Sequence, residues 1–463
     1  MLLAGAFLLL FWGYAEARKP FEIIWNIPSV QCKNVQPDRH GISANENRRF
    51  YGDKMVIFYE TDLGLYPYCL AGPNDVKNEC QINVNGGVPQ AVNLSAHLVK
   101  TREDIVRAIP DENFDGFAVI DWEAWRPLYD LNWTNRRVYQ RLSQSLIYER
   151  YPGLKNTSVD YLARYLFDFH AKQFFLETIR VAKETRPKAR WAFWDFPLCD
   201  YTAGYNGRTE CDPKYEIINE QLLWMFNASD MLLPPIYFYL EDYSTEKRQM
   251  HVKAWIEQAE MINQKLARRL PIYAYSKIEY EVEWTNQTLK EHFYTKSDLC
   301  NSLLYPSQLG VDGVFLWGTS KHMKQRCPLM ADYVENTVGP FASAVIQRAE
   351  KCSKKKCNGN GKCVAIDRTP QTKCELAMQP ATKCVCDEGF VGRSCKRRRR
   401  VDDSFVLSSS LEREDEDEEA SGFPTPPPHP ALNATADVQT ETLFGVTAAP
   451  APADVVYSTY SSN

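Results

Sequence analysis

Short apolar runs alternate with amphipathic helical stretches from residue 20 to residue 349, and this alternation restricts the chain to a few architectures. The runs are rich in Ile, Val, Phe, Tyr and Trp, and several are continuously apolar, as in parallel strands that are buried on both faces. The candidate strands are residues 21–27, 55–60, 117–123, 191–196, 232–238, 272–275 and 313–317.

Helical periodicity separates these strands. It covers residues 162–179 and 252–262, and a third stretch begins near Ser95 and stops at Pro110, whose ring cannot continue a helix. Alternating strands and helices predict an α/β fold, and over this length a (β/α) barrel more than a doubly wound sheet. Periodicity alone leaves both open. No glycine-rich phosphate or dinucleotide fingerprint follows a candidate strand, which disfavours the doubly wound sheet.

The amino-terminal segment predicts export from the cell. Residues 2–12 are apolar and residues 15–17 form a small-x-small cleavage site, so we expect residues 1–17 to be a secretory signal peptide. No Lys or Arg precedes the apolar segment, and a short signal anchor is the alternative. No apolar run reaches the roughly 20 residues that cross a bilayer. We therefore expect no membrane span and a secreted protein, with a lysosomal destination as the alternative.

Two further features agree with export. The 14 Cys residues would be many for a reducing compartment. N-x-S/T sequons, the acceptors of N-linked glycans, are also present, although they arise by chance as well. The sequons lie at Asn93, Asn132, Asn156, Asn227, Asn286 and Asn433.

Residues 396–463 differ in composition from the rest of the chain. The basic run 396–400 is either a proprotein-convertase site or a solvated linker. From Val401 onward the chain carries 12 acidic residues and one basic residue, Arg413, with many Pro, Ser and Thr. Such a tail cannot bury enough apolar area to order itself, so we expect it to be disordered. Because the tail dominates the net charge of −5, that charge says little about polyanionic partners, and we expect no nucleic-acid partner.

The segment that carries the most chemical information is 115–127, where an apolar strand runs directly into two acids, Asp121 and Glu123. Side chains at i and i+2 of a strand point to one side, so both should face one site, at the end of a barrel strand where active sites lie. Two close carboxyl groups raise each other's pKa, and one can stay protonated as a general acid. The alternative from spacing alone is a structural pair that forms a salt bridge with Arg126.

The position of both acids on one strand limits the mechanism. Such neighbours cannot easily bracket a sugar from opposite faces, as an ordinary pair of glycosidase carboxylates does. A glycosidase built on this pair would use one acid/base and one helper. Its nucleophile would come from elsewhere, including the substrate itself.

Several motifs in the same order resemble the hyaluronidase family, glycoside hydrolase family 56. Asp-Trp-Glu-x-Trp-Arg-Pro after Gly-x-x-Val-Ile is similar to the family's signature, and the match covers nearly all of residues 20–349. Further similar segments are residues 21–26 followed by Cys32, 86–90, 93–98, 132–133, 233–237 and 313–317.

The resemblance implies a distorted (β/α) TIM-like barrel and an endo-β-N-acetylhexosaminidase that acts on glycosaminoglycans, chondroitin or hyaluronan. It implies that Glu123 is the proton donor, and that Asp121 hydrogen-bonds Glu123 and helps to orient the N-acetyl group of the substrate. The acetamido oxygen would attack the anomeric carbon, so that configuration is retained. Substrate-assisted routes of this kind are recognised exceptions to the two-carboxylate scheme.

The resemblance also implies substrate-binding aromatic residues. Tyr237 matches a tyrosine that helps to hold the N-acetyl group, Trp317 matches a tryptophan that packs against its methyl, and Tyr59 is expected to line the groove. Packing in the barrel core is the alternative for Tyr237 and Trp317. Trp194 stands where the family usually has a second substrate-holding tyrosine, whose phenolic hydroxyl it lacks. Leu198 stands where an Asp is often found, and both changes put the choice between chondroitin and hyaluronan in doubt.

Residues 352–395 resemble an EGF-like module, which implies the pairs Cys352–Cys363, Cys357–Cys384 and Cys386–Cys395. In the barrel, the family pattern implies Cys32–Cys327 and Cys199–Cys211, and Cys69–Cys80 is a further local pair. Cys300 and Cys374 remain unassigned. A zinc site is the alternative for the cluster, and the lack of paired CxxC spacing in an oxidised chain disfavours it.

Two functions remain open at this point. The first is a secreted hydrolase of glycosaminoglycans. The second is a catalytically weak matrix protein, in which the barrel binds the polysaccharide and the EGF-like module contacts a protein partner. The intact pair of Asp121 and Glu123 favours the enzyme, and Trp194 favours the second function. The seven His show no metal-ligand spacing, so we expect neither a metal nor another cofactor.

Overall fold

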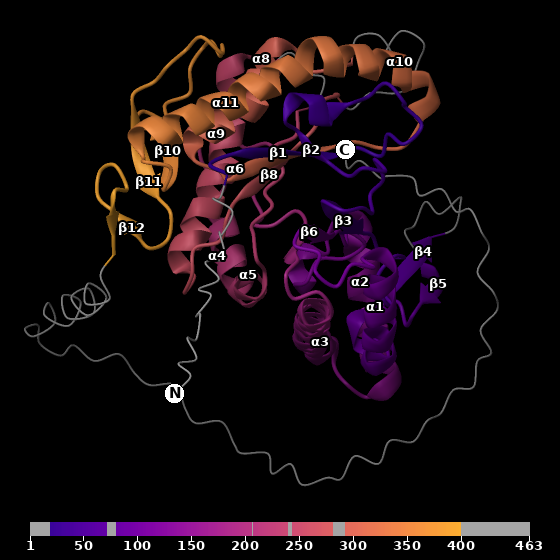
Figure 1. Ribbon diagram of the computed structural model, residues 1–463. Helices are drawn as coiled ribbons and strands as arrows, with labels where there is room; N and C mark the ends of the chain where they lie inside the picture. The colour runs from indigo at the N-terminus through magenta and orange to yellow at the C-terminus, as the bar shows by residue number, and fades with distance from the viewer. Residues whose placement is uncertain (1–18, 72–79, 206, 239–242, 281–291, 400–463) are drawn as a thin grey trace, which may run out of the picture. The chain divides into compact units, whose positions relative to one another are not determined.

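Parallel strands form a barrel in this computed structural model, which describes residues 19–71, 80–205, 207–238, 243–280 and 292–399 (Figure 1). The barrel strands are β1 (Glu22–Asn26), β2 (Ser43–Ala44), β3 (Met55–Phe58), β6 (Phe117–Ile120), β7 (Arg190–Phe193), β8 (Tyr273–Ser276) and β9 (Gly313–Trp317). They make two parallel sheets, with the order β2-β1-β9-β8 in one and β3-β6-β7 in the other.

Isolated bridges and side-chain hydrogen bonds, rather than full ladders, join the two sheets into a barrel. On one side, residues 230–236 lie between β7 and β8, and the Asp230 amide donates to the Trp191 carbonyl over 2.7 Å. On the other side, the Asn45 side chain after β2 donates to the Met55 carbonyl of β3 over 2.9 Å. The expected (β/α) barrel is therefore confirmed, and its distortion lies at these two joints.

Alternate side chains along the strands meet in the barrel interior, because a strand turns successive side chains to opposite faces. The interior cluster consists of Ile24, Met55, Ile57, Phe117, Val119, Ala192, Met231, Leu233, Tyr273, Tyr275 and Phe315. The intervening strand residues face outward into a larger core that the helices share. Phe58 of β3 pairs with Ile120 of β6, and Ile120 pairs with Phe193 of β7. The residue that follows each of these three faces inward, and the three following residues lie at the same height along the barrel.

Helices pack against the outward faces of the strands. The α-helices are α1 (Leu94–Ala108), α2 (Arg137–Arg150), α3 (Asn156–Thr185), α4 (Lys214–Gln221), α5 (Leu223–Ala228), α6 (Thr245–Lys265), α8 (Lys296–Leu299), α9 (Tyr305–Leu309), α10 (Met323–Tyr333) and α11 (Gly339–Lys356). Short 3-10 or π segments are η1 (Pro37–His40), η2 (Pro89–Ala91), η3 (Tyr129–Leu131), η4 (Thr134–Arg136), η5 (Cys300–Leu304) and η6 (Val334–Val338). Among the described helices, none combines the length and the apolar character that a bilayer span requires.

Most of the predicted elements occur, with shifted ends. α1 ends at Ala108, just before the predicted stop at Pro110. Residues 232–238 form isolated bridges instead of the predicted strand. The hairpin of β4 (Tyr68–Ala71) and β5 (Cys80–Val84) was not predicted, because the middle of β5 is exposed and lacks the apolar content of a buried strand.

The C-terminal cysteine-rich segment continues from the barrel without a linker. Helix α11 contacts β1 and η1 of the barrel and then runs through the boundary that we expected between residues 349 and 352. It leads into the antiparallel pair β10 (Gly361–Ala365) and β11 (Thr382–Cys386), followed by the pair β12 (Phe390–Val391) and β13 (Arg397–Arg398). The expected boundary therefore lies inside a helix.

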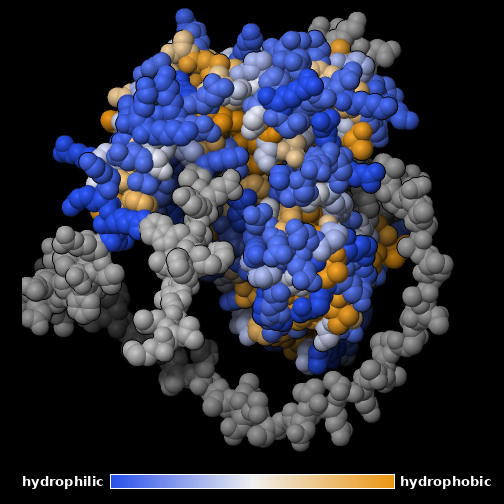
Figure 2. Space-filling model, viewed as in Figure 1, coloured by the Kyte–Doolittle hydropathy of each residue, from blue (hydrophilic) through white to orange (hydrophobic). Residues whose placement is uncertain are grey.

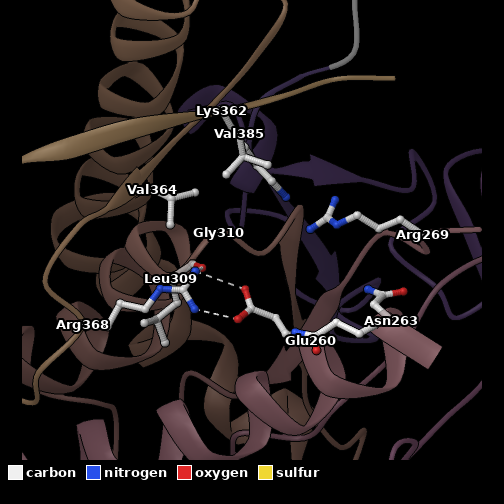
Figure 3. A pocket seen from close by; sticks show the side chains of 10 residues that line it. Glu260, Asn263, Arg269, Leu309, Gly310, Lys362, Val364, Arg368 and Val385 are labelled. Carbon is white, nitrogen blue, oxygen red and sulfur yellow. Dashed lines mark hydrogen bonds and ion pairs between the residues drawn. The ribbon is translucent and has the colours of Figure 1, made fainter. Parts of the chain in front are cut away.

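Ion pairs fasten the cysteine-rich segment to the barrel, and Figure 3 shows the pair of Arg368 and Glu260. Arg368 donates to Glu260 of α6 over 2.6 Å, and Lys362 lies 3.0 Å from Asp312, the residue before β9. Arg368, Glu260 and Lys362 border a cavity of about 250 Å³, into which Arg269 also extends. Because Gly310, which lines the cavity, lies shortly before β9, this cavity is near the amino ends of the strands.

Disulfides include every described cysteine. The pairs are Cys32–Cys327, Cys69–Cys80, Cys199–Cys211, Cys300–Cys374, Cys352–Cys363, Cys357–Cys384 and Cys386–Cys395. All except Cys300–Cys374 are pairs that we had expected. That unassigned pair joins η5 of the barrel to the cysteine-rich segment, and no thiolate is left for a zinc ion.

One predicted glycosylation site is incompatible with the fold. Asn132 is fully buried, and its Nδ2 atom donates to the carbonyls of Arg126 and Leu128 over 3.0 and 2.9 Å. A glycan would have to be attached to that nitrogen, so the prediction for Asn132 is wrong. Asn93, Asn156 and Asn227 are exposed and stay predictions. Asn286, Asn433, the signal peptide and the acidic tail lie outside the described residues.

Replacing Cys300 and Cys374 together with Ala is expected to destabilise the protein by about 2–5 kcal/mol, because the bond closes a long loop. That loop has a sequence separation of 74. Thermal unfolding under non-reducing conditions should show a lower midpoint. The matched control replaces Cys386 and Cys395, whose separation is 9, and should cost less. Equal midpoints for the two double variants would contradict this expectation.

Candidate active site

The residues singled out for chemistry gather at the carboxyl ends of the barrel strands. They are Tyr59 after β3, Asp121 and Glu123 after β6, Trp194 after β7, Tyr237 after residues 230–236 and Trp317 at the end of β9. The Asp121 amide donates to the Phe58 carbonyl over 2.8 Å, and the Trp194 amide donates to the Ile120 carbonyl over 2.9 Å. Tyr59, Asp121 and Trp194 therefore continue the inward-facing alternation of three neighbouring strands at one level.

Four aromatic side chains form a continuous row over the interior cluster, which we call the aromatic wall. Trp317 Nε1 donates to the Tyr59 hydroxyl over 3.1 Å. The ring centres of Trp317 and Tyr237 are 6.4 Å apart, as are those of Tyr237 and Trp194. The Lys277 ammonium lies 4.7 Å from the Tyr237 ring centre. All four rings pack on the interior cluster and are only partly buried, so they are not core residues alone.

The two acids differ in exposure and in charge. Asp121 is 4% exposed, and its Oδ1 atom has no hydrogen-bond partner among the described residues. Burial, and then the Glu123 carboxylate, raise the pKa of Asp121 well above its usual value. Glu123 is open to solvent on one side and surrounded by protein on the others, and the loss of solvation raises its pKa to about 7. A carboxyl group with this pKa can both donate and accept a proton near neutral pH.

Charged groups from two other segments hold the backbone of Glu123. Glu60, which follows β3, accepts hydrogen bonds from the Glu123 amide over 2.8 Å and from the Ala124 amide over 3.1 Å. Arg136 Nε donates to the Glu123 carbonyl over 2.9 Å. The backbone at Glu123 therefore cannot shift without breaking three hydrogen bonds.

A buried ion pair lies beside the acids. Arg126 is bonded to Asp195, which is fully buried and also accepts a hydrogen bond from the Tyr201 hydroxyl over 3.0 Å. The salt bridge of Arg126 is thus made to Asp195 and not to the acid pair. Arg126 lowers the pKa of Glu123 and Asp195 raises it. Asp195 has a left-handed backbone with φ 67°, which is uncommon outside glycine and is often found at functional sites.

Sequence reasoning missed Glu60, Asp195 and Arg136. A signal existed for the first two, because each lies at the end of a predicted strand, and the ends of parallel barrel strands meet at one face. Arg136 is the last residue of the 3-10 turn η4, and no spacing rule marks it. Leu198, which we expected near the substrate, is buried in the outer core.

The arrangement has the groups for acid–base cleavage of a sugar linkage. Glu123 has a pKa at which it can donate a proton, Asp121 lies beside it, and the aromatic wall offers ring faces on which a sugar can pack. In the part of the chain that the structure describes, no group of three or more His, Cys, Asp or Glu is placed to hold a metal ion. A barrel with this site is a glycoside hydrolase.

Comparisons with known proteins identify the family. The family model described as hyaluronidase matches residues 14–403. A chondroitin hydrolase of Caenorhabditis elegans is 32% identical over 384 residues, which are 82% of this chain and 81% of that protein. Hyaluronidase-1 of Homo sapiens is 32% identical over 388 residues, 80% of this chain and 84% of that protein. The crystal structure of bee venom hyaluronidase with a hyaluronic acid tetramer is similar at TM-score 0.62 and 28% identity, covering 70% of this chain and 99% of that one. The chain belongs to the hyaluronidase family, as the sequence motifs indicated.

Asp195→Asn is expected to lower the pKa of Glu123, because the variant removes a carboxylate that raises this pKa and leaves the opposing charge of Arg126 uncompensated. Since Glu123 must be protonated to act as an acid, the high-pH limb of kcat/KM should move to lower pH by about one unit. A pH profile of hydrolysis measures the limb.

Asp230→Asn is the matched control for this shift. Asp230 is ion-paired with Lys183 and accepts a hydrogen bond from the Trp191 amide near the start of β7, whereas Asp195 follows the end of the same strand. The control should leave the limb unchanged. A limb that stays in place or moves to higher pH in Asp195→Asn would contradict the electrostatic role.

Proposed function

We propose that the chain is an endo-β-N-acetylhexosaminidase that hydrolyses β-1,4 hexosaminide bonds in chondroitin or hyaluronan. The observation that carries the proposal is the one-sided pair of acids, Glu123 with a pKa of about 7 beside buried Asp121. The other carboxylates that act on this pair, Glu60 and Asp195, are occupied by backbone amides and by Arg126. Since neither is available as a nucleophile, a nucleophile from the substrate is favoured.

In the proposed reaction, Glu123 donates its proton to the glycosidic oxygen as the bond from that oxygen to the anomeric carbon breaks. The acetamido oxygen of the same sugar attacks the anomeric carbon and forms a cyclic oxazolinium ion. Glu123, now a carboxylate, takes a proton from a water molecule that adds to this carbon and reopens the ring. Two displacements retain the configuration, and Glu123 ends the cycle protonated.

Asp121 and the aromatic wall would hold the reacting N-acetyl group. Asp121 Oδ1, which lacks a partner among the described residues, is suited to accept a hydrogen bond from the acetamido N–H. Tyr237 and Trp317 are neighbours in the wall and would contact the carbonyl and methyl of the same group. Tyr59 supports Trp317 through its hydroxyl.

The choice of substrate rests on charge and on the named relatives. Chondroitin and hyaluronan carry carboxylates, and Lys277 brings a positive charge to the aromatic wall. The similar proteins named chondroitin hydrolase and hyaluronidase support the same class of polymer. A catalytically weak matrix protein is disfavoured, because Glu123 has the pKa that acid catalysis needs. The seven disulfides favour secretion or a lysosomal destination, and we expect the reaction to need no metal.

Glu123→Gln is expected to lower kcat by about 10²–10⁴-fold on either polymer, because glutamine keeps the shape of the side chain but cannot donate the proton. A reducing-end assay on purified chondroitin and hyaluronan, with the products sized by mass spectrometry, measures the rate and the endo pattern. Glu184→Gln, an exposed glutamate of α3 paired with Arg180, is the matched control and should keep full activity.

Three results would refute parts of this proposal. A wild-type protein that shortens neither polymer refutes the function. A Glu123→Gln variant as active as the wild type refutes the assigned acid. Proton NMR of the first product should show the β-anomer, and an α-anomer refutes the substrate-assisted step.

Trp194→Tyr is expected to raise the activity on hyaluronan relative to chondroitin by up to about tenfold. The two hexosamines differ at C4, and the variant exchanges an indole that stacks on Tyr237 for a smaller ring with a hydroxyl. The ratio of kcat/KM values on the two polymers measures the effect. Trp224→Tyr, in α5 and packed on the outer core, is the control. An unchanged ratio in Trp194→Tyr would remove Trp194 from the residues that set specificity.

A further inference from the structure

Positive charge is concentrated in one part of the chain. Residues 1–350 carry 39 Lys or Arg and 43 Asp or Glu, whereas residues 351–399 carry 13 Lys or Arg and only four Asp or Glu. Two of these 13, Lys362 and Arg368, face the barrel in ion pairs. The others are exposed: Lys351, Lys354, Lys355, Lys356, Lys373, Lys383, Arg393, Lys396, Arg397, Arg398 and Arg399. Within the described residues, Lys354 alone of this exposed set forms an ion pair, at 4.0 Å from Glu350.

The first group of exposed cations lies on the last turns of α11. Lys351, Lys354 and Lys355 are spaced at i, i+3 and i+4, which places them on one side of a helix, and they border a surface hollow with Gln347 and Glu350. Cations at the end of a helix interact favourably with its dipole, but this effect falls off within the last turn. The helix dipole therefore does not explain the presence of Lys351 or of the cations at residues 396–399.

The second group is residues 396–399, of which Arg397 and Arg398 form strand β13. In β13, Arg397 pairs with Val391 and Arg398 pairs with Phe390 of β12. The Arg398 guanidinium lies 5.8 Å from the Phe390 ring centre, and the Arg399 amide donates to the Gly389 carbonyl over 2.8 Å. Ordered cations lose less conformational entropy on binding a ligand than cations on a flexible chain.

Hydrogen bonds connect the two groups into one body. Asn358, just after α11, donates to the Ser394 carbonyl over 2.7 Å, and Asn360 donates to the Cys395 carbonyl over 3.2 Å. Cys395 is also bonded to Cys386. Figure 2 shows hydrophilic side chains over this part of the molecule. We call the exposed cations of α11 and residues 396–399 the basic surface.

The basic surface is separate from the candidate active site. The cysteine-rich segment is fastened through Arg368 to α6 and through Lys362 to Asp312, which precedes β9. These attachments lie near the amino ends of the strands, whereas Glu123 follows the carboxyl end of β6. The segment that carries the surface is therefore attached at the opposite end of the barrel from Glu123.

We propose that the basic surface is a second binding site, which holds a sulfated glycosaminoglycan chain. Closely spaced cations attract a polymer of high negative charge density, because binding releases the counterions of that polymer. Chondroitin sulfate carries a carboxylate and a sulfate ester in each disaccharide, and hyaluronan carries a carboxylate only. The choice of a glycosaminoglycan over other polyanions rests on the proposed function. A chain held here would be retained near the enzyme between cleavage events.

Binding to immobilised chondroitin sulfate tests the proposal, with full-length Glu123→Gln protein so that the polymer is not consumed. One triple variant replaces Arg397, Arg398 and Arg399 with Gln, and a second replaces the three lysines 351, 354 and 355 with Gln. Each should weaken binding by about tenfold or more, and should lower the slope of log K against log salt by roughly one for every cation that binds the polymer and is replaced. The affinity for hyaluronan should change less.

A matched control removes the same charge elsewhere. Arg150, Lys155 and Lys188 are exposed on the barrel, and replacing all three with Gln should leave the affinity and the salt slope unchanged. Equal losses in the control and in the test variants would overturn the proposal, because binding would then follow net charge alone. If one triple variant unfolds at a lower temperature than the Glu123→Gln protein, its binding result is set aside, and the other triple variant tests the proposal.

Two further outcomes concern the acidic tail as a competing ligand and the proposed function. Residues 401–463 carry 12 acidic residues, so the tail is itself a polyanion tethered next to β13. If the full chain does not bind chondroitin sulfate but the chain without residues 401–463 does, the tail occupies the surface and the proposal is overturned. Hydrolysis by the chain with Glu123 intact is measured separately. Binding without any hydrolysis would refute the proposed function and leave the second site in place.

Discussion

Successive side chains of a strand point to opposite faces, and the rest of the site depends on this alternation in the parallel strands. In β3, β6 and β7 the same alternation that buries Ile57, Val119 and Ala192 in the barrel interior carries Tyr59, Asp121 and Trp194 to its open end. A slip of one residue in any of these strands would turn its last side chain outward into the helical layer. The packing of the interior and the position of the chemical groups are therefore one property of the sequence.

The proton affinity of Glu123 is a balance of opposing influences. Loss of solvation, Asp195 and Glu60 raise its pKa, while Arg126 and Arg136 lower it. Burying the ion pair of Arg126 and Asp195 costs desolvation energy, and such pairs contribute little net stability. Its presence next to the acids is understandable if its benefit is electrostatic, because fixed charges act strongly where water is displaced.

Features that depend on local periodicity were predictable, and features that depend on long-range packing were not. The barrel strands and the acid pair follow from apolar runs and from the i, i+2 geometry of a strand. By contrast, the burial of Asn132 depends on how a loop folds back on itself, and a sequon carries no information on that. The bond between Cys300 and Cys374 joins a barrel helix to a distant segment, and no spacing rule reports on such proximity. Asp195 pairs with Arg126 across 69 positions of sequence, so only the folded chain shows the contact.

Helix α11 is part of both the barrel and the cysteine-rich segment. Its first turns pack on β1 and η1, while its last turns carry Cys352 and Ser353, whose hydroxyl donates to the Gly361 carbonyl over 2.6 Å. A recombination event that exchanged the cysteine-rich segment would have to join two parts of one helix. The side chains of each part would have to stay on their original faces. Evolutionary shuffling of this segment between unrelated proteins is accordingly hindered, and the two parts are bound to vary together.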